Sequence, residues 1–296
     1  MKGKWIKRVT IDALWSGKHR VEWNLNEGVN VLSGVNGVGK STIIRRLEDG
    51  LAGRTEAVHI TYEPEGAQSV DYDVVRGYEP QAITRELLVR VAGVMAEMDA
   101  ADKDRFLDTI DTLLAATGKT IVRNSAELRF NHEGDILTIE QLSNGERQML
   151  FILLTILAQR REHCVLLMDE MDAADKGRFL DTIDTLLAAT GKTIVRNSAE
   201  LRFNHEGDIL TIEQLSNGER QMLFILLTIL AQRREPCVLL MDEPEISLHI
   251  EWQQRLIALI RDINPNVQLI LTTHSPAVIM DGWMDCVTDA SDIIIN

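Results

Sequence analysis

The chain has few cysteines, no long apolar run and a deficit of positive charge. Only 3 of its 296 residues are cysteine, and because their spacing fits no metal-binding pattern, reduced thiols in a cytoplasmic setting are expected. The longest apolar run, Met222–Ala231, is too short to span a bilayer, which takes about 18 or more residues. The N-terminal MKGKWIKRV is basic but lacks the apolar block of a signal peptide.

The charge balance also limits the possible partners. With 31 basic and 45 acidic residues, the net charge is −14. Such a surface repels nucleic acid on average, so contact with DNA would require a local basic patch or a partner protein.

Strand and helix patterns alternate along most of the chain, and a hydrophobic content of 45% is ample for a packed core. This alternation predicts a mostly parallel, helix-covered sheet. Val58–Tyr62 and Val70–Val75 flank a turn and are predicted to form a hairpin. Further strands are expected at Trp5–Ala13, Arg20–Leu25, Val29–Ser33, Leu128–Phe130, Ile136–Ile139, Val238–Met241 and Gln268–Thr272, and helices at Ser41–Leu51, Ile83–Met98, Arg105–Ala116 and Ile250–Ile263.

A glycine-rich loop, Gly34–Thr42, follows the third predicted strand and reads GVNGVGKST. Glycine lets backbone N–H groups turn inward around a phosphate, and the helix that begins here adds positive potential. Lys40 would reach the β- and γ-phosphates of a nucleotide, and the Ser41 hydroxyl would ligate Mg²⁺. The expected phosphate-binding residues are Asn36, Gly37, Val38, Gly39, Lys40, Ser41 and Thr42.

A second motif places two carboxylates at the end of an apolar strand. Val238–Met241 is followed directly by Asp242 and Glu243. The aspartate can hold Mg²⁺ through water, and the glutamate can polarise an attacking water molecule. An apolar run before two acids is a weak signal alone, but together with the glycine-rich loop it predicts nucleotide hydrolysis.

Part of the chain occurs twice in tandem. Glu97–Asp169 (copy 1) is repeated as Glu170–Asp242 (copy 2), and the copies differ only where Asp104 and His163 are replaced by Gly177 and Pro236. Each copy therefore contains the segment LSNGERQ and ends in CVLLMD before a glutamate. The glycine-rich loop occurs once.

These motifs, with MDEPEISLH at Met241–His249 and LTTHSP at Leu271–Pro276, resemble those of ABC-type ATPases over nearly the whole length. The resemblance implies an α/β P-loop NTPase fold, with a mostly parallel sheet, helices on both faces, an N-terminal antiparallel β subdomain and a helical signature region. It also implies binding of ATP with Mg²⁺, and a homodimer that encloses ATP at its interface.

The resemblance assigns roles to further residues. His274 corresponds to the switch histidine that contacts the γ-phosphate. Gln81 is the candidate glutamine for contact with Mg²⁺ and water, and Gln68 competes for that role. In LSNGERQ, the signature residues Ser216 and Gly218 would close over the γ-phosphate of the opposite subunit. Glu219, which follows them, is also expected to belong to the nucleotide-binding site, and Ser143 and Gly145 are the copy 1 equivalents of Ser216 and Gly218.

The segment PEISLH narrows the resemblance to the RecF/SMC/Rad50-like and OLD-like branches, which act in DNA repair or maintenance and in anti-phage defence. The coiled-coil insertion of SMC and Rad50 proteins and the nuclease domain of OLD proteins are absent from the sequence. A small stand-alone bacterial ATPase with a separately encoded effector is therefore expected. Two alternatives are the nucleotide-binding subunit of a transporter, and an ATP-dependent switch or scaffold that hydrolyses little.

The duplication complicates the domain prediction. We expect one ABC-type domain over residues 1–296, with one repeat equivalent extruded from its core, because a chain can leave a fold in copy 1 and re-enter it at the equivalent point of copy 2. On this hypothesis copy 2 supplies the working Glu243. Domain swapping, docking of copy 1 with copy 2 looped out, and a duplication without a selected role remain open.

Overall fold

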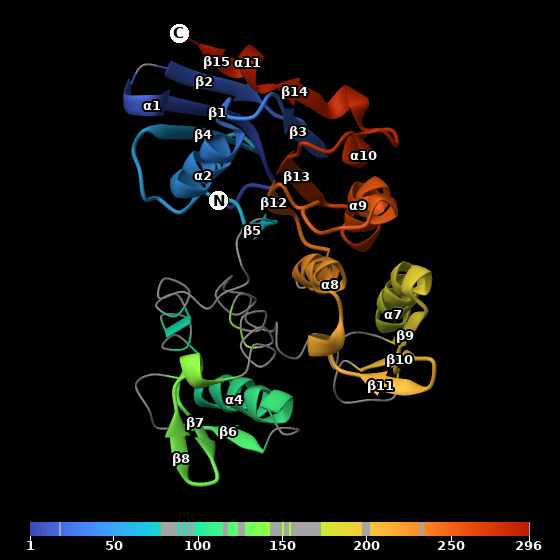
Figure 1. Cartoon of the computed structure of the whole chain (residues 1–296). Coiled ribbons are helices and arrows are strands. Elements are labelled where there is room, and N and C mark those ends of the chain that lie inside the picture. Colours follow the sequence, from blue (N-terminus) through green and yellow to red (C-terminus); the bar gives the residue numbers. More distant parts are fainter. Residues whose placement is uncertain are drawn as a thin grey trace. The chain divides into compact units, whose positions relative to one another are not determined.

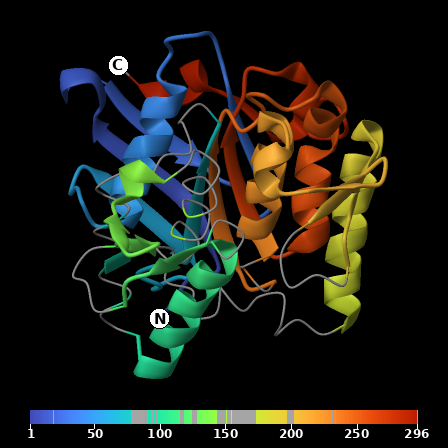
Figure 2. The same cartoon turned by 60° about the horizontal axis from the view of Figure 1, so that its bottom comes forward.

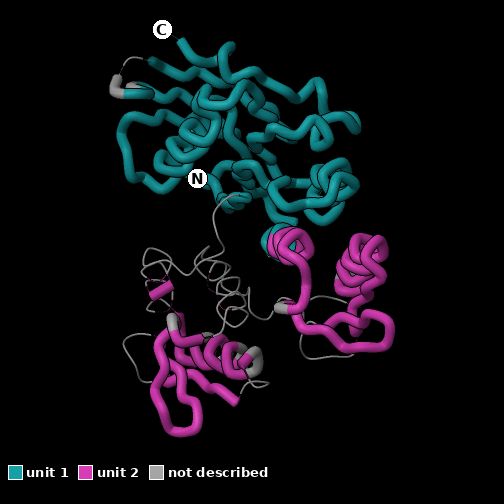
Figure 3. The backbone as a smooth tube through the Cα atoms, viewed as in Figure 1, with its two compact units in different colours: residues 1–79, 225–296 teal, residues 80–224 magenta. Residues whose placement is uncertain are grey.

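The computed structural model describes residues 1–17, 19–77, 88, 91–92, 95, 98–114, 118–123, 128–142, 150, 154, 173–196, 202–230, 232 and 234–295. They fall into two compact units (Figure 3). Unit 1 comprises residues 1–79 and 225–296, and unit 2 comprises residues 80–224. Several predicted site residues lie outside the described residues: Gln81, Ser143, Gly145 and Glu170.

Unit 1 contains a five-stranded sheet, ordered β14-β3-β13-β12-β5, in which every neighbouring pair is parallel. Two of its three interior strands, β12 and β13, are buried at every residue, as expected of a parallel sheet covered on both faces. Helices α2 and α9 flank these strands on opposite sides (Figures 1 and 2). The elements are β14 (Val287–Asp289), β3 (Val29–Ser33), β13 (Val267–Thr272), β12 (Cys237–Asp242), β5 (Tyr72–Arg76), α2 (Lys40–Leu51) and α9 (Ile250–Ile263).

A four-stranded antiparallel sheet, ordered β15-β2-β1-β4, completes the core of unit 1. Its apolar residues form one cluster with α2 and the parallel sheet, to which α2 contributes Ile43, Ile44 and Leu47. The strands are β15 (Ile294–Ile295), β2 (His19–Asn24), β1 (Trp5–Ala13) and β4 (Val58–Glu63), and the short helices of the unit are α1 (Leu14–Gly17), α10 (Pro276–Ile279), η6 (Met284–Cys286) and α11 (Ala290–Ile293).

The predicted hairpin between β4 and β5 is wrong. β4 pairs with β1 in the antiparallel sheet, whereas β5 pairs with β12 in the parallel sheet. The apolar pattern identified both strands, but their partners lie far away in the sequence, so a short connection did not make them neighbours.

Unit 2 contains the first part of each repeat, built in the same way. Copy 1 forms α4 and a three-stranded antiparallel sheet, and copy 2 forms α7 and a sheet of identical register. The strand at the start of each sheet, at Lys119 and at Lys192, was not predicted. The elements are α4 (Ala100–Leu114), β6 (Lys119–Ile121), β7 (Phe130–His132), β8 (Asp135–Leu137), η2 (Ile139–Gln141), α7 (Ala173–Leu187), η4 (Ala188–Thr190), β9 (Lys192–Ile194), β10 (Phe203–His205), β11 (Asp208–Leu210) and η5 (Ile212–Gln214).

After η5, copy 2 continues through α8 (Asn217–Leu230) into β12. Strand β12 therefore comes from copy 2, and it ends at Asp242 between β5 and β13. Most of the corresponding part of copy 1 lies outside the described residues. No helix among the residues that the structure describes is long and apolar enough to cross a membrane.

Candidate functional site

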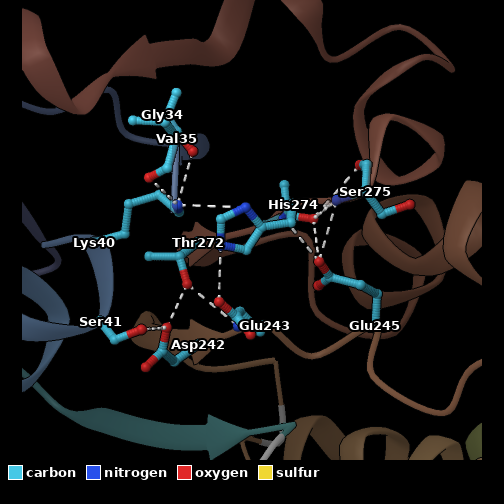
Figure 4. Close-up of polar contacts among 11 residues, drawn as sticks. Gly34, Val35, Lys40, Ser41, Asp242, Glu243, Glu245, Thr272, His274 and Ser275 are labelled. Atoms are coloured by element: carbon cyan, nitrogen blue, oxygen red, sulfur yellow. Dashed lines mark hydrogen bonds and ion pairs between the residues drawn. The ribbon is translucent and has the colours of Figure 1, made fainter. Parts of the chain in front are cut away.

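The glycine-rich loop connects β3 to α2 and carries Lys40 at the first turn of the helix. Gly37 and Gly39 have positive φ values of 82° and 99°, a conformation that residues with a Cβ rarely adopt. Lys40 Nζ donates to the carbonyl oxygens of Gly34 at 2.8 Å and Val35 at 3.3 Å. The lysine thus lies folded over its own loop (Figure 4).

Burial lowers the pKa of Lys40 from its ordinary value, while the nearby carboxylates of Glu243 and Asp242 oppose this shift. The negative charge at the end of β12 therefore favours the protonated form of the lysine. The remaining loop residues vary in exposure: Asn36 is exposed, and Val38 and Thr42 are half-buried.

Ser41 and Asp242 meet where α2 begins and β12 ends. Ser41 Oγ donates to Asp242 Oδ1 at 3.0 Å, and Thr272 Oγ1 donates to the same carboxylate oxygen at 2.5 Å. Asp242 is fully buried. A hydroxyl and a carboxylate are oxygen ligands of the kind that Mg²⁺ takes, with water and phosphate completing its coordination. This pair therefore fits the expected metal.

Glu243 is the next residue, and its side chain faces His274. Glu243 Oε1 lies 3.0 Å from His274 Nε2, and His274 Nδ1 lies 3.4 Å from Lys40 Nζ. The three side chains form a chain of contacts across the ends of β12, β13 and the glycine-rich loop (Figure 4). The structure thus brings together Lys40, Ser41, Asp242, Glu243 and His274.

The backbone of Glu243 is held in an unusual conformation. Its φ is 49°, in the left-handed region that costs a non-glycine residue of order 1–3 kcal/mol. Its N–H lies between the backbone oxygen of Thr272 at 3.1 Å and the hydroxyl oxygen of the same residue at 3.2 Å. Thr272 therefore contacts both carboxylate residues, a role that the sequence reading missed.

Gly77 was also missed. It follows β5, and its N–H donates to the Asp242 carbonyl at 2.9 Å. A Cβ at this position would lie 1.8 Å from the Glu243 carbonyl oxygen. Any side chain at residue 77 would therefore displace Glu243, and the lone glycine after an apolar strand was the available signal.

Trp15 is a third residue without a predicted role. A Cβ on Gly39 would lie 2.4 Å from the Trp15 indole, so the ring packs directly against the loop. The ring of His19 approaches the indole edge-on, with 5.3 Å between ring centroids. Trp15 is 40% exposed, so this residue beside the loop is partly accessible.

The signature residues of copy 2 begin α8 and belong to unit 2. Glu219 Oε2 accepts from the Ser216 N–H at 2.7 Å, and Ser216 Oγ accepts from the Glu219 N–H at 3.3 Å. This reciprocal capping box fixes the start of the helix. Glu219 Oε1 also accepts from Thr190 Oγ1 at 2.7 Å and Lys192 Nζ at 2.9 Å. Gly218 is buried beside Glu219.

Burial would raise the pKa of Glu219, but hydrogen bonds from Thr190, Lys192 and Ser216 outweigh it and lower the pKa to about 2. The signature carboxylate is therefore ionised and held in place at neutral pH. Gln68, the alternative to Gln81, is exposed, and its N–H donates to the Met1 carbonyl at 3.2 Å.

Comparison with known families identifies the family to which the chain belongs. A sequence profile described as "ABC transporter" matches residues 19–173, more than half of the chain. The chain belongs to the ABC-type ATPase family. A second profile, described as "AAA domain, putative AbiEii toxin, Type IV TA system", matches residues 177–281. The predicted ABC-type fold and family are confirmed.

Curated relatives of this ABC ATPase include the Septu protein PtuA of Bacillus thuringiensis. It is 23% identical over 320 residues, which covers 93% of this chain and 72% of the relative. The Retron Vc95 probable ATPase of Vibrio cholerae is 30% identical over 89 residues, and the Retron Ec83 probable ATPase of Escherichia coli is 36% identical over 80 residues. These two matches span 29% and 23% of this chain, and 17% and 15% of the retron proteins.

Solved structures with a similar chain path include the SMC head domain from Thermotoga maritima. It is 13% identical and has a TM-score of 0.47, and the match covers 98% of this chain and 94% of that chain. A nucleotide-free ATP-binding cassette from an ABC transporter is 14% identical with a TM-score of 0.41, and covers 94% of this chain and 85% of the other.

Proposed function

We propose that this ABC ATPase binds ATP with Mg²⁺ and hydrolyses it to ADP and phosphate. The observation that carries the proposal is the chain of contacts from Lys40 through His274 to Glu243, at 3.4 and 3.0 Å. It lies beside the Ser41–Asp242 pair, so a lysine, a histidine and two carboxylates converge on one glycine-rich loop. Phosphoryl transfer relies mainly on such positioning and charge stabilisation.

Each side chain has a distinct part in the proposed reaction. Lys40 would exchange the carbonyls of Gly34 and Val35 for the β- and γ-phosphate oxygens. Ser41 and Asp242 would hold Mg²⁺, which would supply positive charge to the bound phosphates.

Two further side chains would act on water and on the transferred phosphate. Glu243 would accept a hydrogen bond from the attacking water and orient it for in-line attack on the γ-phosphorus. His274 would donate to a γ-phosphate oxygen from its place beside Glu243. Gln81 remains the candidate for a further contact to Mg²⁺ and water.

Trp15 would contribute to nucleotide binding through its indole ring beside the loop. The ring packs on Gly39, so a base bound over the loop would lie within stacking range. Stacking of a base on an aromatic side chain contributes about 1–3 kcal/mol in nucleic-acid complexes.

The signature segment of copy 2 would act on a second subunit. In a homodimer around ATP, Ser216 and Gly218 at the N-terminus of α8 would face the γ-phosphate bound by the partner chain, where the helix N-terminus favours negative charge. We propose that copy 2 supplies both this signature and Glu243, and that copy 1 supplies neither.

The cellular role that we propose is anti-phage defence together with a separately encoded effector. A Septu protein and two retron ATPases are among the relatives, which supports this role over service to a membrane transporter. The net charge of −14 gives no support to direct binding of DNA by the whole surface.

Phosphate release and ATP binding by the purified chain test the proposal. Glu243→Gln should lower phosphate release by at least about 100-fold, in the range expected for loss of a general base, and should still bind labelled ATP. Lys40→Ala should lose binding. The control is Glu251→Gln, which changes an exposed carboxylate on α9. A wild type that binds ATP and releases no phosphate would instead favour the ATP-dependent switch.

A further inference from the structure

Glu245 lies in PEISLH, the segment that narrowed the resemblance to particular branches of the ABC-type ATPases. It has no part in the chemistry proposed above. It follows Glu243 by two residues, and its side chain is only 7% exposed. Carboxylates are seldom buried in this way without partners. The contacts of Glu245 therefore indicate its role.

The carboxylate of Glu245 binds the turn that carries the histidine. Its Oε1 accepts hydrogen bonds from Thr273 Oγ1 at 2.5 Å, from the His274 N–H at 2.9 Å and from the Ser275 N–H at 3.3 Å (Figure 4). These donors are consecutive residues between β13 and α10. Three donors therefore share one buried oxygen, and Glu245 fixes the whole turn.

A second connection joins the same two segments. Ser275 Oγ donates to Gln253 Oε1 at 2.6 Å, and Gln253 Nε2 donates to the Leu248 carbonyl at 2.9 Å. The segment after β12 and the turn after β13 are therefore linked through the carboxylate of Glu245 and again through the amide of Gln253.

The hydrogen bonds from Thr273, His274 and Ser275 to Glu245 form a clamp on the turn. This clamp matters because the His274 ring is exposed and has contacts that a nucleotide would change. The ring side chain is 37% exposed. Its nitrogens face Glu243 and Lys40, both of which would take new partners when ATP and water are bound. The Glu245 clamp acts instead on the His274 backbone, so it can persist through those changes.

We propose that Glu245 is a positioning residue that holds His274 beside Glu243 during ATP hydrolysis. The proposal rests on the proposed function of the site. Glu245 acts on the reaction through the turn at Thr273–Ser275 and is not itself a ligand of the nucleotide in this proposal. Misplacement of such a group by about 1 Å can cost on the order of 100-fold in rate.

The test compares Glu245→Ala with Glu245→Gln in steady-state ATP hydrolysis. Glu245→Ala should lower kcat by about 10- to 100-fold, as loss of an outer-shell partner does elsewhere, and should leave KM for ATP within about threefold. Glu245→Gln should recover most of the rate, because an amide oxygen still accepts from the three donors. Equal loss in both variants, or a change confined to KM, would overturn the proposal.

Combination with His274→Ala separates positioning from general destabilisation. If Glu245 acts through His274, the double variant should be no slower than His274→Ala alone, since coupled residues are not additive. Multiplied losses would overturn the proposal. Glu251→Ala is the matched control, because it removes a nearby exposed carboxylate.

A readout independent of turnover distinguishes failure of this proposal from failure of the proposed function. The chain has 7 histidines, and the ring signal of His274 in an NMR spectrum is assigned by its loss in His274→Ala. At one fixed pH, Glu245→Ala should move that signal and leave the others in place. An unchanged signal would overturn the proposal. A wild type without phosphate release would reject hydrolysis, while the ring signal would still test the clamp.

Discussion

The two copies of the repeat begin alike and end in different surroundings. In each, a helix of 15 residues packs beside a three-stranded sheet, and the sheets share one register. An aspartate in each helix accepts from the backbone of the first strand: Asp111 from Ile121 N–H at 2.5 Å, and Asp184 from Ile194 N–H at 2.6 Å. These contacts lie within one copy, so the same sequence forms the same local structure twice.

The structure of the second half of copy 2 depends on strands that lie outside the repeat. Strand β12 lies between β5, which precedes both copies in the chain, and β13, which follows both. The sheet has one place between these two strands, and Cys237–Asp242 fills it. Contacts within a copy can be made twice, whereas a place in a shared sheet is taken by one of two competing segments.

The largest expected effect tests which copy supplies the glutamate. Glu243→Gln should lower phosphate release by at least about 100-fold, whereas Glu170→Gln should leave it within about twofold, because the second copy's strand occupies the sheet. Steady-state phosphate release of the two variants measures this. Loss in Glu170→Gln with retention in Glu243→Gln would mean that the roles of the copies are reversed.

A second comparison removes the same buried ring from each copy. Phe130 and Phe203 are both fully buried, and Phe→Ala in a core costs about 3–5 kcal/mol. Thermal denaturation should show destabilisation of both variants. If copy 2 supplies the signature, phosphate release should fall in Phe203→Ala, which removes a buried ring from the same copy, and should stay within about twofold in Phe130→Ala. Equal loss of activity would show that both copies are needed.

The third prediction uses the pH dependence of stability to compare Glu219 of copy 2 with its copy 1 equivalent, Glu146. The pKa of Glu219 is about 2 in the folded chain, against an ordinary value of 4.5. Its contribution to stability is therefore complete above about pH 4.5 and is lost as the pH falls towards 2. The shift corresponds to on the order of 3 kcal/mol. Urea unfolding of Glu219→Gln should lose this part of the pH dependence.

The control for this measurement is Glu146→Gln, the equivalent change in copy 1. Glu146→Gln should leave the acid dependence of stability in place. If it removes as much of that dependence as Glu219→Gln, the two glutamates contribute equally to stability and the effect is not specific to copy 2. A wild type whose stability is flat between pH 4.5 and 2 would contradict the assigned pKa.

The smallest expected effect concerns one of the two differences between the copies. Gly177 lies inside α7, and a Cβ there would meet no atom within 4 Å. Gly177→Ala should therefore raise the free energy of unfolding by about 0.5–1 kcal/mol. Asp104→Gly should lower it by a similar amount, because Asp104 holds the equivalent position in α4. Chemical denaturation curves of both variants provide the measurement, and a destabilised Gly177→Ala would contradict it.

Most strands and helices of unit 1 could be predicted because their signals are local. The expected Trp5–Ala13, Val29–Ser33 and Ile250–Ile263 have the bounds of β1, β3 and α9. Apolar spacing and turn residues determined them. The hairpin of β4 and β5 could not be judged in this way, because the apolar pattern of a strand does not name its partner.

The residues of the candidate site also fall into two groups, those that the sequence predicts and those that only the fold brings together. The sequence by itself determined the glycine-rich loop at Gly34–Thr42 and the acidic strand end at Asp242 and Glu243, because each is a short motif of consecutive residues. Only the tertiary structure decided that Thr272, Gly77, Trp15 and Glu245 belong beside them. These residues reach the site through sheet pairing and loop packing, and their neighbours lie tens to hundreds of positions away. It also decided that the strand of copy 2 lies between β5 and β13, since two nearly identical segments compete for one place in the sheet.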